Sequence, residues 1–298
     1  MSRVLVFGGG GFIGRHVCDA LGQHPEVSEV RAPGREVCDL VSTEPDDLAD
    51  LLRDVRPEVV VNCTGRLSGT GYDLVRANAM VTGKLIDAIA RHSPAVRLVR
   101  LGSAAEYGVV EFQHAVHEDD AALPVSEYGV SHLAGTQLVT LASAAGDVDG
   151  VVLRVFNPIG PGLHPDNMLG RAVALIRDAQ RDGGEHVEMG PLSSWRDFVD
   201  VRDVATAVCA AAFAQLSDHR VFNVGRGRAI RCRQAMELLA GVAGFHGEVR
   251  EAAAGPARSA TVDWMLADVS RAADTLKWMP RHELADSVNG VWAGMDER

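Results

Sequence analysis

The sequence predicts an α/β fold in which a parallel sheet is doubly wound, and three observations support this class. Apolar runs of strand length alternate with longer helical patterns through the first half of the chain. These runs are apolar enough to be buried on both faces, which is typical of a parallel sheet covered by helices. A glycine-rich turn joins the first apolar run to the first helical pattern, as such sheets commonly show.

The expected elements of the first half follow in chain order. The first strand covers residues 3–8, and a helix runs from Phe12 to about Gln23. Two longer amphipathic helices are expected from about Asp73 to Arg91 and from Tyr128 to Ala145. The other strands of this half are expected at residues 28–33, 57–65, 96–103 and 151–157.

The character of the chain changes after Asn157. The segment NPIGPGLHPDN contains prolines and glycines that break regular structure, and a helix is expected from about Leu169 to Ala179. A short strand and a helix follow within residues 196–214, and residues 220–225 form another strand. The remainder is expected to be mostly helical.

This pattern predicts two domains between which the chain passes more than once. Residues 1–156 and about 193–224 are assigned to the sheet domain. Residues from about 157 to 192 and from 225 to 298 are assigned to a smaller, mostly helical domain. Because the segment after Asn157 is irregular, it marks the first crossover.

Composition limits the classes of function. A chain of 298 residues with 47% hydrophobic residues can bury a sizeable core. Its 29 basic and 40 acidic residues give a net charge of -11, which argues against nucleic acid as a partner. Any anionic ligand must therefore be held by local arginines.

Cysteine usage and the apolar runs bear on metal, compartment and membrane. The cysteines form no CxxC or His/Cys ligand spacing, so we expect no metal site and a reducing, cytoplasmic location. The start of the chain lacks the pattern of a secretory signal, and no run reaches the ~20 apolar residues of a membrane span. We therefore expect no membrane association. The cysteines are Cys18, Cys38, Cys63, Cys209 and Cys232.

The turn VLVFGGGGFIG indicates a dinucleotide site. Gly8, Gly11 and Gly14 form a GxxGxxG pattern directly after a strand and at the opening of a helix. Glycines allow backbone N–H groups, including those of Phe12 and Ile13, to approach a pyrophosphate at the positive end of the helix. The predicted sheet is therefore of the Rossmann type.

The end of the second strand decides between NAD and NADP. An NAD site usually offers a carboxylate there to the ribose 2′-OH, whereas this chain offers Arg31 and Arg35, and Glu29 comes too early. Two guanidinium groups suit a 2′-phosphate, so NADP(H) is favoured over NAD(H). The remaining cofactor contacts are expected at Asp39 and Leu40 beside the adenine and at Thr64 and Gly65 beside the second ribose.

Blocks spread over almost the whole chain resemble the extended short-chain dehydrogenases/reductases, the family of nucleotide-sugar epimerases, dehydratases and reductases. They match the family pattern in order, so the resemblance implies a nucleotide-diphosphate sugar as substrate and a nicotinamide cofactor. The blocks include GGGGFIG, VVVNCTG, LGSAAEYG, SEYGVSHLAGTQL, LRVFNPIGPG, SWRDFVDVRDVATAV and LADVSRAADTLKWMPR.

The resemblance implies three catalytic residues. Tyr128 corresponds to the tyrosine that passes a proton to or from the sugar oxygen while hydride moves at the nicotinamide. Ser103 corresponds to the residue whose hydroxyl orients that oxygen and so contacts the substrate. His132 stands where the family has a lysine, which binds the nicotinamide ribose and lowers the pKa of the tyrosine. Residues i and i+4 share a helix face, so this spacing is consistent with the roles.

The histidine at position 132 favours one direction of reaction. Lowering the pKa of a tyrosine from ~10 toward ~7 requires roughly 4 kcal/mol, and a histidine with a reference pKa near ~6.5 supplies little of it. Tyrosinate should then be scarce, although His132 should keep a ribose hydrogen bond. Oxidation needs a base, whereas reduction needs a protonated acid, which a neutral Tyr128 already is.

We therefore expect NADPH-dependent reduction of a keto group on a nucleotide-diphosphate sugar, a 4-keto-6-deoxyhexose. Ala104 and Ala105 stand where the related 4,6-dehydratases carry acids, which argues against dehydration, and GSAAEYG resembles the GDP-4-keto-6-deoxyhexose reductases. Three alternatives stay open: an NAD-dependent nucleotide-sugar epimerase, a catalytically impaired cofactor-binding homologue, and a reductase of a non-sugar ketone.

The resemblance also implies substrate contacts and an assembly. Arg196 and Arg258 correspond to residues that contact the diphosphate, Asn157 to a residue against the substrate, and Asn167 is expected near the nucleobase. The two amphipathic helices correspond to those that pair in a dimer interface, so a homodimer is expected. Their apolar faces would alternatively be buried against their own sheet.

Overall fold

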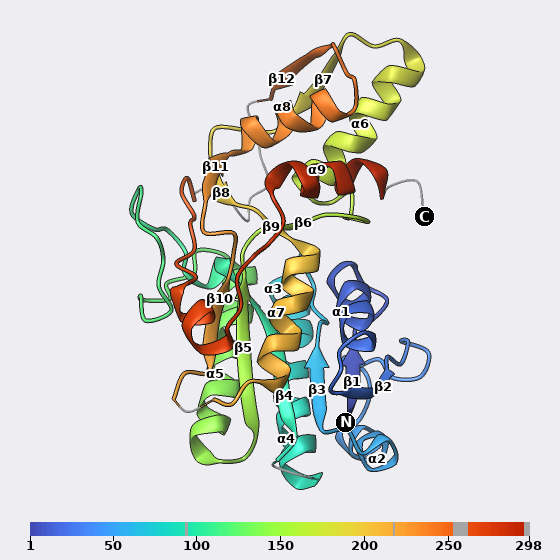
Figure 1. The fold of residues 1–298 in the computed structure, drawn as a ribbon, viewed down its shortest axis with the longest axis vertical. Coiled ribbons are helices and arrows are strands. Elements are labelled where there is room, and N and C mark those ends of the chain that lie inside the picture. The colour runs from blue at the N-terminus through green and yellow to red at the C-terminus, as the bar shows by residue number, and fades with distance from the viewer. Residues whose placement is uncertain (93–94, 217, 253–261, 295–298) are drawn as a thin grey trace.

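The structure is a computed structural model and describes residues 1–92, 95–216, 218–252 and 262–294. Its central element is a sheet of six strands in which every neighbouring pair is parallel (Figure 1). The predicted α/β fold with a Rossmann-type doubly wound sheet is therefore confirmed. The strand order is β10 (Val221–Val224), β5 (Asp149–Val155), β4 (Arg97–Ser103), β3 (Val59–Asn62), β1 (Ser2–Phe7) and β2 (Val27–Arg31).

Helices cover both faces of this sheet. On one face, α1 (Phe12–Gly22) and α7 (Val201–Phe213) bury side chains such as Leu21 and Val204 against the strands. On the other face, α2 (Pro45–Val55), α4 (Val81–His92) and α5 (Glu127–Ala145) bury side chains such as Leu48, Leu85 and Val139. Each large aliphatic side chain buried in this way contributes about 1.5–3 kcal/mol, so the two cores fix which face each helix covers.

Local signals set the ends of α5. Ser126 is the N-cap, and its hydroxyl oxygen accepts a hydrogen bond from the backbone N–H of Gly129 at 3.1 Å. Gly146 ends the helix with a φ of 80°, a left-handed conformation that glycine adopts without steric cost. The cap fixes the beginning of the helix at Glu127, and Tyr128 therefore lies in the first turn.

The smaller part of the molecule, at the top of Figure 1, contains α6 (Met168–Asp182), α8 (Cys232–Val242) and α9 (Leu284–Ala293). These helices share an apolar core of their own, in which Val173, Met236 and Val288 are fully buried. The described residues also form three two-stranded sheets. Their pairs are β7 (His186–Met189) with β12 (Glu248–Glu251), β8 (Trp195–Asp197) with β11 (Ala229–Arg231), and β6 (Pro158–Ile159) with β9 (Val199–Asp200).

One C-terminal segment returns to the large sheet. The sequence assigns residues 225–298 to the smaller domain, yet η4 (Ala272–Leu276) and Trp278 belong to the apolar core beneath α1 and α7. The indole N–H of Trp278 donates to Thr206 Oγ1 at 2.9 Å and to the carbonyl oxygen of Asp203 at 3.2 Å. The predicted division does not account for this return.

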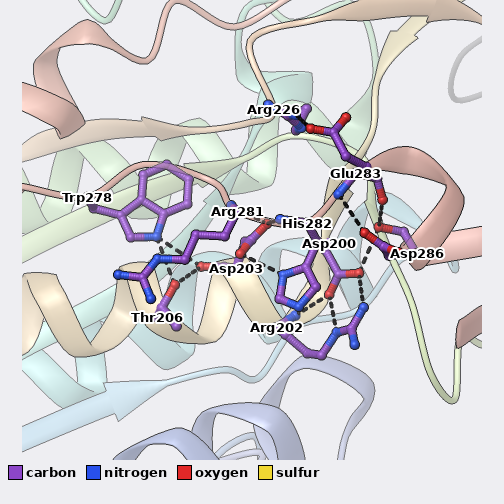
Figure 2. A network of polar contacts seen from close by, with 11 residues as sticks. Asp200, Arg202, Asp203, Thr206, Arg226, Trp278, Arg281, His282, Glu283 and Asp286 are labelled. Carbon is purple, nitrogen blue, oxygen red and sulfur yellow. Dashed lines mark hydrogen bonds and ion pairs between the residues drawn. The ribbon is translucent and has the colours of Figure 1, made fainter.

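Polar contacts at the N-terminus of α7 join the two parts (Figure 2). Asp200 caps this helix by accepting from the backbone N–H of Arg202 at 2.8 Å, and the hydroxyl of Ser287 in α9 donates to the same carboxylate at 2.7 Å. Asp203 accepts from the backbone N–H of His282 at 2.9 Å. The two carboxylates therefore hold the segment that leads into α9 against the sheet part.

The described ranges allow three further statements. None of their helices has the length and apolarity needed to cross a bilayer. No three histidine, cysteine, aspartate or glutamate side chains within these ranges are grouped so that they could ligate a metal ion. The five cysteines are free thiols, and those at positions 38, 209 and 232 are buried.

Candidate active site

The candidate site lies where the strand order reverses. β1 lies between β2 and β3. The chain passes from β1 to β2 on one side and then crosses to β3 on the other side of β1. In open parallel sheets, ligands bind at the carboxyl ends of the strands beside such a reversal. Because the strands are parallel, the turns after β1, β2, β3 and β4 all open at this edge. These turns carry most of the predicted cofactor residues.

The glycine turn after β1 is packed too closely for side chains. Gly8 has a φ of 79°, and a Cβ there would lie 3.0 Å from the backbone of Cys63 and Thr64. A Cβ on Gly14 would overlap the carbonyl group of Gly8. The turn therefore brings the start of α1 directly against the end of β1, as a backbone cradle for a pyrophosphate requires.

Gly11, Phe12 and Ile13 form the start of α1. Gly11 is the N-cap and offers no side chain, and the first turn carries no acidic residue, so the helix N–H groups and the positive helix end are not neutralised there. Phe12 packs partly against the core of the smaller part, and Ile13 against the sheet core. The helix start therefore lies between the two parts, where it fits an anionic pyrophosphate.

The two arginines after β2 differ in their contacts. Arg31 Nε donates to Glu29 Oε1 at 2.7 Å, and Arg31 Nη1 lies 3.7 Å from Asp54 Oδ2. Arg35 is exposed in the next loop and, within the part of the chain that the structure describes, makes no ion pair. Carboxylates thus engage the guanidinium of Arg31, whereas none of those described engages that of Arg35.

Lys84 of α4 holds the loop that contains the predicted adenine contacts. Its Nζ donates to the carbonyl oxygens of Leu40 at 3.3 Å, Val41 at 3.1 Å and Thr43 at 2.8 Å. Asp39 Oδ1 accepts from the backbone N–H of Val41 at 3.1 Å, and Leu40 is buried in the core. Asp39 and Leu40 therefore occupy an ordered loop between β2 and α2.

Thr64 and Gly65 lie in the turn after β3. The hydroxyl of Thr64 donates to Asn62 Oδ1 at 2.6 Å, and the backbone N–H of Thr64 donates to the same oxygen at 3.0 Å. A Cβ on Gly65 would lie 3.3 Å from Asn78 Oδ1. This turn faces the glycine turn, since the closest neighbours of Gly8 include the backbone N of Thr64.

Asn78 is a site residue that the sequence analysis missed. It is buried in η1 (Arg76–Met80), a π-helical segment between α3 (Gly71–Val75) and α4, and such widened turns are frequent at functional sites. Its Oδ1 accepts from the backbone N–H of Arg66 at 2.8 Å, and its Nδ2 donates to Ser131 Oγ at 3.0 Å. Asn78 thereby ties the turn after β3 to α5. The signal was a polar residue within an otherwise helical apolar pattern.

The structure brings the segments of Ser103 and Tyr128 together. Ser103 ends β4, and its Oγ accepts from the backbone N–H of Ala105 at 3.2 Å, which caps the 3-10 turn η2 (Ala104–Glu106). A Cβ on Gly129 would overlap the carbonyl oxygen of Ala105. The first turn of α5, which carries Tyr128, therefore packs directly against the turn that follows Ser103.

His132 lies one helical turn beyond Tyr128 and is buried. The centroids of the two rings are 4.6 Å apart, with an angle of 54° between their planes. Burial, together with the positive charge of Arg100, lowers the pKa of His132 well below its usual value of about 6.5, so the imidazole is neutral. Its Nδ1 is buried with no hydrogen-bond partner in the described structure. An unpartnered imidazole nitrogen beside Tyr128 fits a ribose hydroxyl of a bound nicotinamide nucleotide.

A buried ion pair supports the turn after Ser103. Glu106 is fully buried, and its Oε2 accepts from Arg154 Nε at 2.9 Å. Its Oε1 accepts from the backbone N–H of Ser103 and from the hydroxyl of Thr136 in α5, both at 3.0 Å. In the sequence, Glu106 stands out only as part of the block GSAAEYG. In the structure it fixes the backbone of Ser103 and ties η2 to α5.

Asn157 and Asn167 both have structural partners. Asn157 follows β5, and its Nδ2 donates to the carbonyl oxygen of Asp197 at 3.1 Å. Asn167 is the N-cap of α6, and its Oδ1 accepts from the backbone N–H of Leu169 at 3.3 Å. Each residue stands at the beginning of a segment of the smaller part. Contacts of either side chain with a substrate stay a prediction.

The predicted diphosphate arginines are only partly described. Arg196 in β8 is buried, and its guanidinium donates to the carbonyl oxygens of Trp195 at 2.8 Å and Val262 at 2.7 Å. Burial lowers the pKa of Arg196. Arg258 lies outside the described residues. Trp195 and Trp264 pack against each other, with ring centroids 5.7 Å apart.

The assembled edge combines a backbone cradle for a dinucleotide with a phenol and a hydroxyl. The cradle comes from the turn after β1, and the two hydroxyl groups come from β4 and α5. A bound nicotinamide can transfer hydride, and a phenol can transfer the accompanying proton. The arrangement is therefore suited to oxidation and reduction between an alcohol and a carbonyl group.

Comparisons with known proteins agree with this chemistry. Residues 4–225 match the NAD dependent epimerase/dehydratase family. The chain is 39% identical over 303 residues to dTDP-6-deoxy-L-talose 4-dehydrogenase (NAD(P)(+)) from Kitasatospora kifunensis, which covers 98% of this chain and 95% of that protein. It is 28% identical over 311 residues to GDP-6-deoxy-D-mannose reductase from Pseudomonas aeruginosa, which covers 100% and 98%.

A solved structure supports the fold over the full length. RMD from Pseudomonas aeruginosa, complexed with NADPH, superposes with a TM-score of 0.88 at 25% sequence identity. The superposition covers 100% of both chains. The similarity therefore includes the smaller part as well as the sheet.

Proposed function

The chain belongs to the NAD dependent epimerase/dehydratase family, and on this premise we propose that it reduces the 4-keto group of a nucleotide-diphosphate 6-deoxyhexose with NADPH. Its general activity is that of an NAD(P)-dependent oxidoreductase. The observation that carries the proposal is the packing of the Ser103 turn against the first turn of α5, at the same edge of the sheet as the glycine turn. Both curated relatives are named for 6-deoxyhexoses linked to a nucleotide diphosphate, which supports the substrate class.

The name of the 39% identical relative specifies dehydrogenation at position 4. Dehydrogenation and reduction are the two directions of one reaction, and the same groups act in both by microscopic reversibility. The name therefore supports the reacting carbon without selecting the direction. We propose reduction because the 28% identical relative is named as a reductase, and because the phenol of Tyr128 is the proton donor that this direction needs.

The proposed mechanism assigns one task to each side chain. The phenol of Tyr128 donates its proton to the oxygen of the reacting carbonyl, on which negative charge develops. The hydroxyl of Ser103 donates a hydrogen bond to the same oxygen, and Glu106 holds the backbone of Ser103 in place. NADPH, when bound, supplies the hydride. Proton transfer by a positioned side chain contributes about 10²–10⁴-fold to a rate.

A substrate screen tests this function. The protein is titrated separately with NADPH and NADH by fluorescence, and then mixed with GDP-, dTDP- and UDP-linked 4-keto-6-deoxyhexoses while cofactor absorbance is followed. We expect one NADPH to be oxidised for each sugar reduced, at a rate that Tyr128→Phe lowers about 10²–10⁴-fold. Turnover of the sugar without net use of cofactor would instead indicate the epimerase.

The proposed preference for NADP(H) rests on Arg35. A charge-assisted hydrogen bond contributes about 1.5–3 kcal/mol, so Arg35→Ala should weaken NADPH binding about 10–100-fold and leave NADH binding unchanged. Arg31→Ala should weaken NADPH binding less, because Glu29 and Asp54 already engage that guanidinium. Fluorescence titration of both variants with both cofactors measures the difference. Equal effects of Arg35→Ala on NADPH and NADH would contradict the 2′-phosphate contact.

We also propose that the protein is a homodimer in which α5 and the α3/η1/α4 helices pair with a second copy. The outer faces of these helices carry apolar side chains that this chain leaves exposed. An exposed apolar set of this kind, on adjacent elements, is typical of a protein interface. The set comprises Tyr72, Val75, Met80, Val130, Leu138 and Leu141.

The smaller part is proposed to bind the sugar nucleotide. Arg196 and Arg258 are proposed to contact the diphosphate, and Asn157 and Asn167 to contact the remainder of the substrate. Three of these residues are described in the structure. Arg196 lies in β8, Asn157 follows β5, and Asn167 is the N-cap of α6. Backbone carbonyls accept from one N–H of Nη1 and one of Nη2, so the guanidinium of Arg196 has further N–H donors for a ligand.

A further inference from the structure

A buried arginine lies behind the helix that carries Tyr128. Arg100 of β4 is 2% exposed, and its guanidinium is held entirely by uncharged acceptors. Its Nη2 donates to the carbonyl oxygens of His132 at 3.1 Å and Asn78 at 3.3 Å. Its Nε and Nη1 donate to the hydroxyls of Thr82 at 3.0 Å and Thr136 at 3.1 Å. In the described part of the chain, no carboxylate pairs with it.

Helix α5 provides space for the guanidinium of Arg100. A Cβ on Gly135 of α5 would overlap Nη2 of Arg100 and would lie 2.6 Å from its Cζ. Glycine in a helix interior costs up to about 1 kcal/mol relative to alanine, so its presence in the middle of α5 needs a reason. Accommodation of Arg100 is that reason.

The nearest carboxylate is already neutralised by another arginine. Glu106 pairs with Arg154 through Oε2, and its Oε1 accepts from Ser103 and Thr136. The buried cluster thus contains two guanidinium groups and one carboxylate. Arginine side chains remain protonated in proteins, so the cluster keeps one positive charge in excess.

The other groups around Tyr128 do not cancel this charge. His132 is neutral, and Glu127 is exposed at the beginning of α5. The carboxylate of Asp73 in α3 is turned to the N-cap residue Thr70, and Arg76 stacks on the exposed ring of Tyr72. The described charged and titratable side chains on α5 and on the elements packed against it are Glu127, Tyr128, His132, Tyr72, Asp73, Arg76, Lys84, Asp87, Arg91, Arg97, Arg100, Glu106, Asp149 and Arg154.

Arg100 and Tyr128 are close enough to interact electrostatically. Burial lowers the pKa of Arg100, whereas the negative charges of Glu106 and of an ionised Tyr128 raise it. The interaction is reciprocal, so a charged Arg100 favours the phenolate form of Tyr128. The cation lies one turn along α5 from the phenol, since it donates to the backbone of residue 132.

We propose that Arg100 is a positioning residue that supplies the fixed positive charge which stabilises the Tyr128 phenolate, the electrostatic task that the lysine at position 132 has in the family. The imidazole of His132 then retains only the contact with the cofactor. This inference rests on the proposed function for its catalytic meaning, but the charge effect on Tyr128 exists without substrate.

The positive charge of Arg100 changes which direction of reaction the site can support. With Arg100 in place, a tyrosinate is available for alcohol oxidation: its oxygen takes the hydroxyl proton, the carbon loses hydride to the nicotinamide of NADP⁺, and the carbonyl forms. Reduction is the exact reverse in atoms and electrons. The scarcity of tyrosinate that the sequence predicts from His132 alone therefore does not follow, and both directions are open.

A spectroscopic titration tests the charge effect without substrate. The chain has three tyrosines, and burial raises the pKa of Tyr107 to about 12. Ultraviolet absorbance of phenolate is followed against pH for the wild type, Tyr128→Phe and Arg100→Met, and the transition that Tyr128→Phe removes is that of Tyr128. We expect Arg100→Met to raise the midpoint of this transition by about one unit, because charges in such clusters interact at an effective dielectric constant of about 20.

Two matched variants separate charge from structure. Arg97 lies on the same strand but on the opposite face, where it pairs with Asp149 at 2.6 Å, so Arg97→Met should leave the midpoint unchanged. The double variant Arg100→Met with His132→Lys moves the cation to the family position and should restore the low midpoint. A midpoint that is the same in the wild type and in folded Arg100→Met would overturn the inference.

A second route covers the case in which Arg100→Met does not fold. Gly135→Ala keeps the arginine but displaces its guanidinium, and it should raise the midpoint in the same direction. An unshifted midpoint in Gly135→Ala would count against the inference. The pH profile of kcat for alcohol oxidation should shift with the midpoint in each variant, with KM for the sugar unchanged. Failure of the substrate screen alone contradicts the proposed function, whereas failure of the titration contradicts only the role of Arg100.

Discussion

At the scale of single residues, Tyr128 and Ser103 should contribute unequally to turnover. Tyr128→Phe removes the proton donor and should lower kcat about 10²–10⁴-fold, with NADPH affinity unchanged. Ser103→Ala removes one hydrogen bond to the reacting oxygen and should lower kcat about 10–100-fold. Steady-state kinetics and cofactor titration measure both effects. The exposed Tyr72 is the control, and Tyr72→Phe should behave as the wild type.

His132 should make stability depend on pH. Its pKa in the folded protein lies below its unfolded value of about 6.5, so its stabilising contribution is complete above that pH and is lost as pH falls through the folded pKa. The slope reaches up to about 1.4 kcal/mol per pH unit. Urea unfolding at several pH values should show a shallower acid loss in His132→Gln than in the wild type. An equal slope in both would contradict the buried neutral imidazole, and the exposed His186→Gln should leave the slope unchanged.

Residue roles were predictable where a local motif carries them. The glycine turn and the Tyr128 segment are short patterns with fixed spacing, and the structure places them at the same edge of the sheet. Arg100 and Asn78 were not predictable, because their roles depend on which helix packs above them. Arg31 is intermediate: Glu29 two positions earlier shares its strand face, a neighbour that the sequence already offered.

At the scale of elements, the glycine turn should be intolerant of a single methyl group. Gly14→Ala places a Cβ on the carbonyl group of Gly8, so α1 must move away from β1 and the cradle widens. We expect a loss of NADPH affinity of at least about tenfold, measured by fluorescence titration. Gly22→Ala, at the other end of the same helix, meets no atom within 4 Å and should bind as the wild type. Unchanged affinity in Gly14→Ala would show that the cofactor does not use this turn.

Element prediction succeeded in the large sheet and only in part in the small ones, where the short strand expected within residues 196–214 is present but β6, β7, β11 and β12 were not predicted. Five of the six parallel strands have an apolar run that is buried by helices, so their sequences carry the signal alone, whereas the edge strand β2 is only partly buried. The helix at Pro45–Val55 was not predicted, although Pro45 at its first position and Asp46 and Asp47 in its first turn are typical start signals. β7 and β12 pair across distant segments, and only the folded chain brings these short strands together.

At the scale of the whole molecule, the proposed dimer makes a direct prediction. Leu141 is 67% exposed on α5, and Leu141→Glu introduces a charge that a second copy would have to bury. We expect the wild type to sediment as a dimer and Leu141→Glu as a monomer, by analytical ultracentrifugation. Met279 is 57% exposed outside these helices, and Met279→Glu should remain dimeric. A wild type that sediments as a monomer would contradict the proposal.

The return of Ala272, Leu276 and Trp278 to the core beneath α1 and α7 has a consequence for synthesis of the protein. On the ribosome, the sheet emerges first, but one part of its apolar covering is among the last segments to be translated. The nascent sheet therefore keeps an uncovered patch until translation is almost complete. Truncation shortly before residue 272 should accordingly leave an insoluble product, even though the predicted dinucleotide site and catalytic residues would all be present.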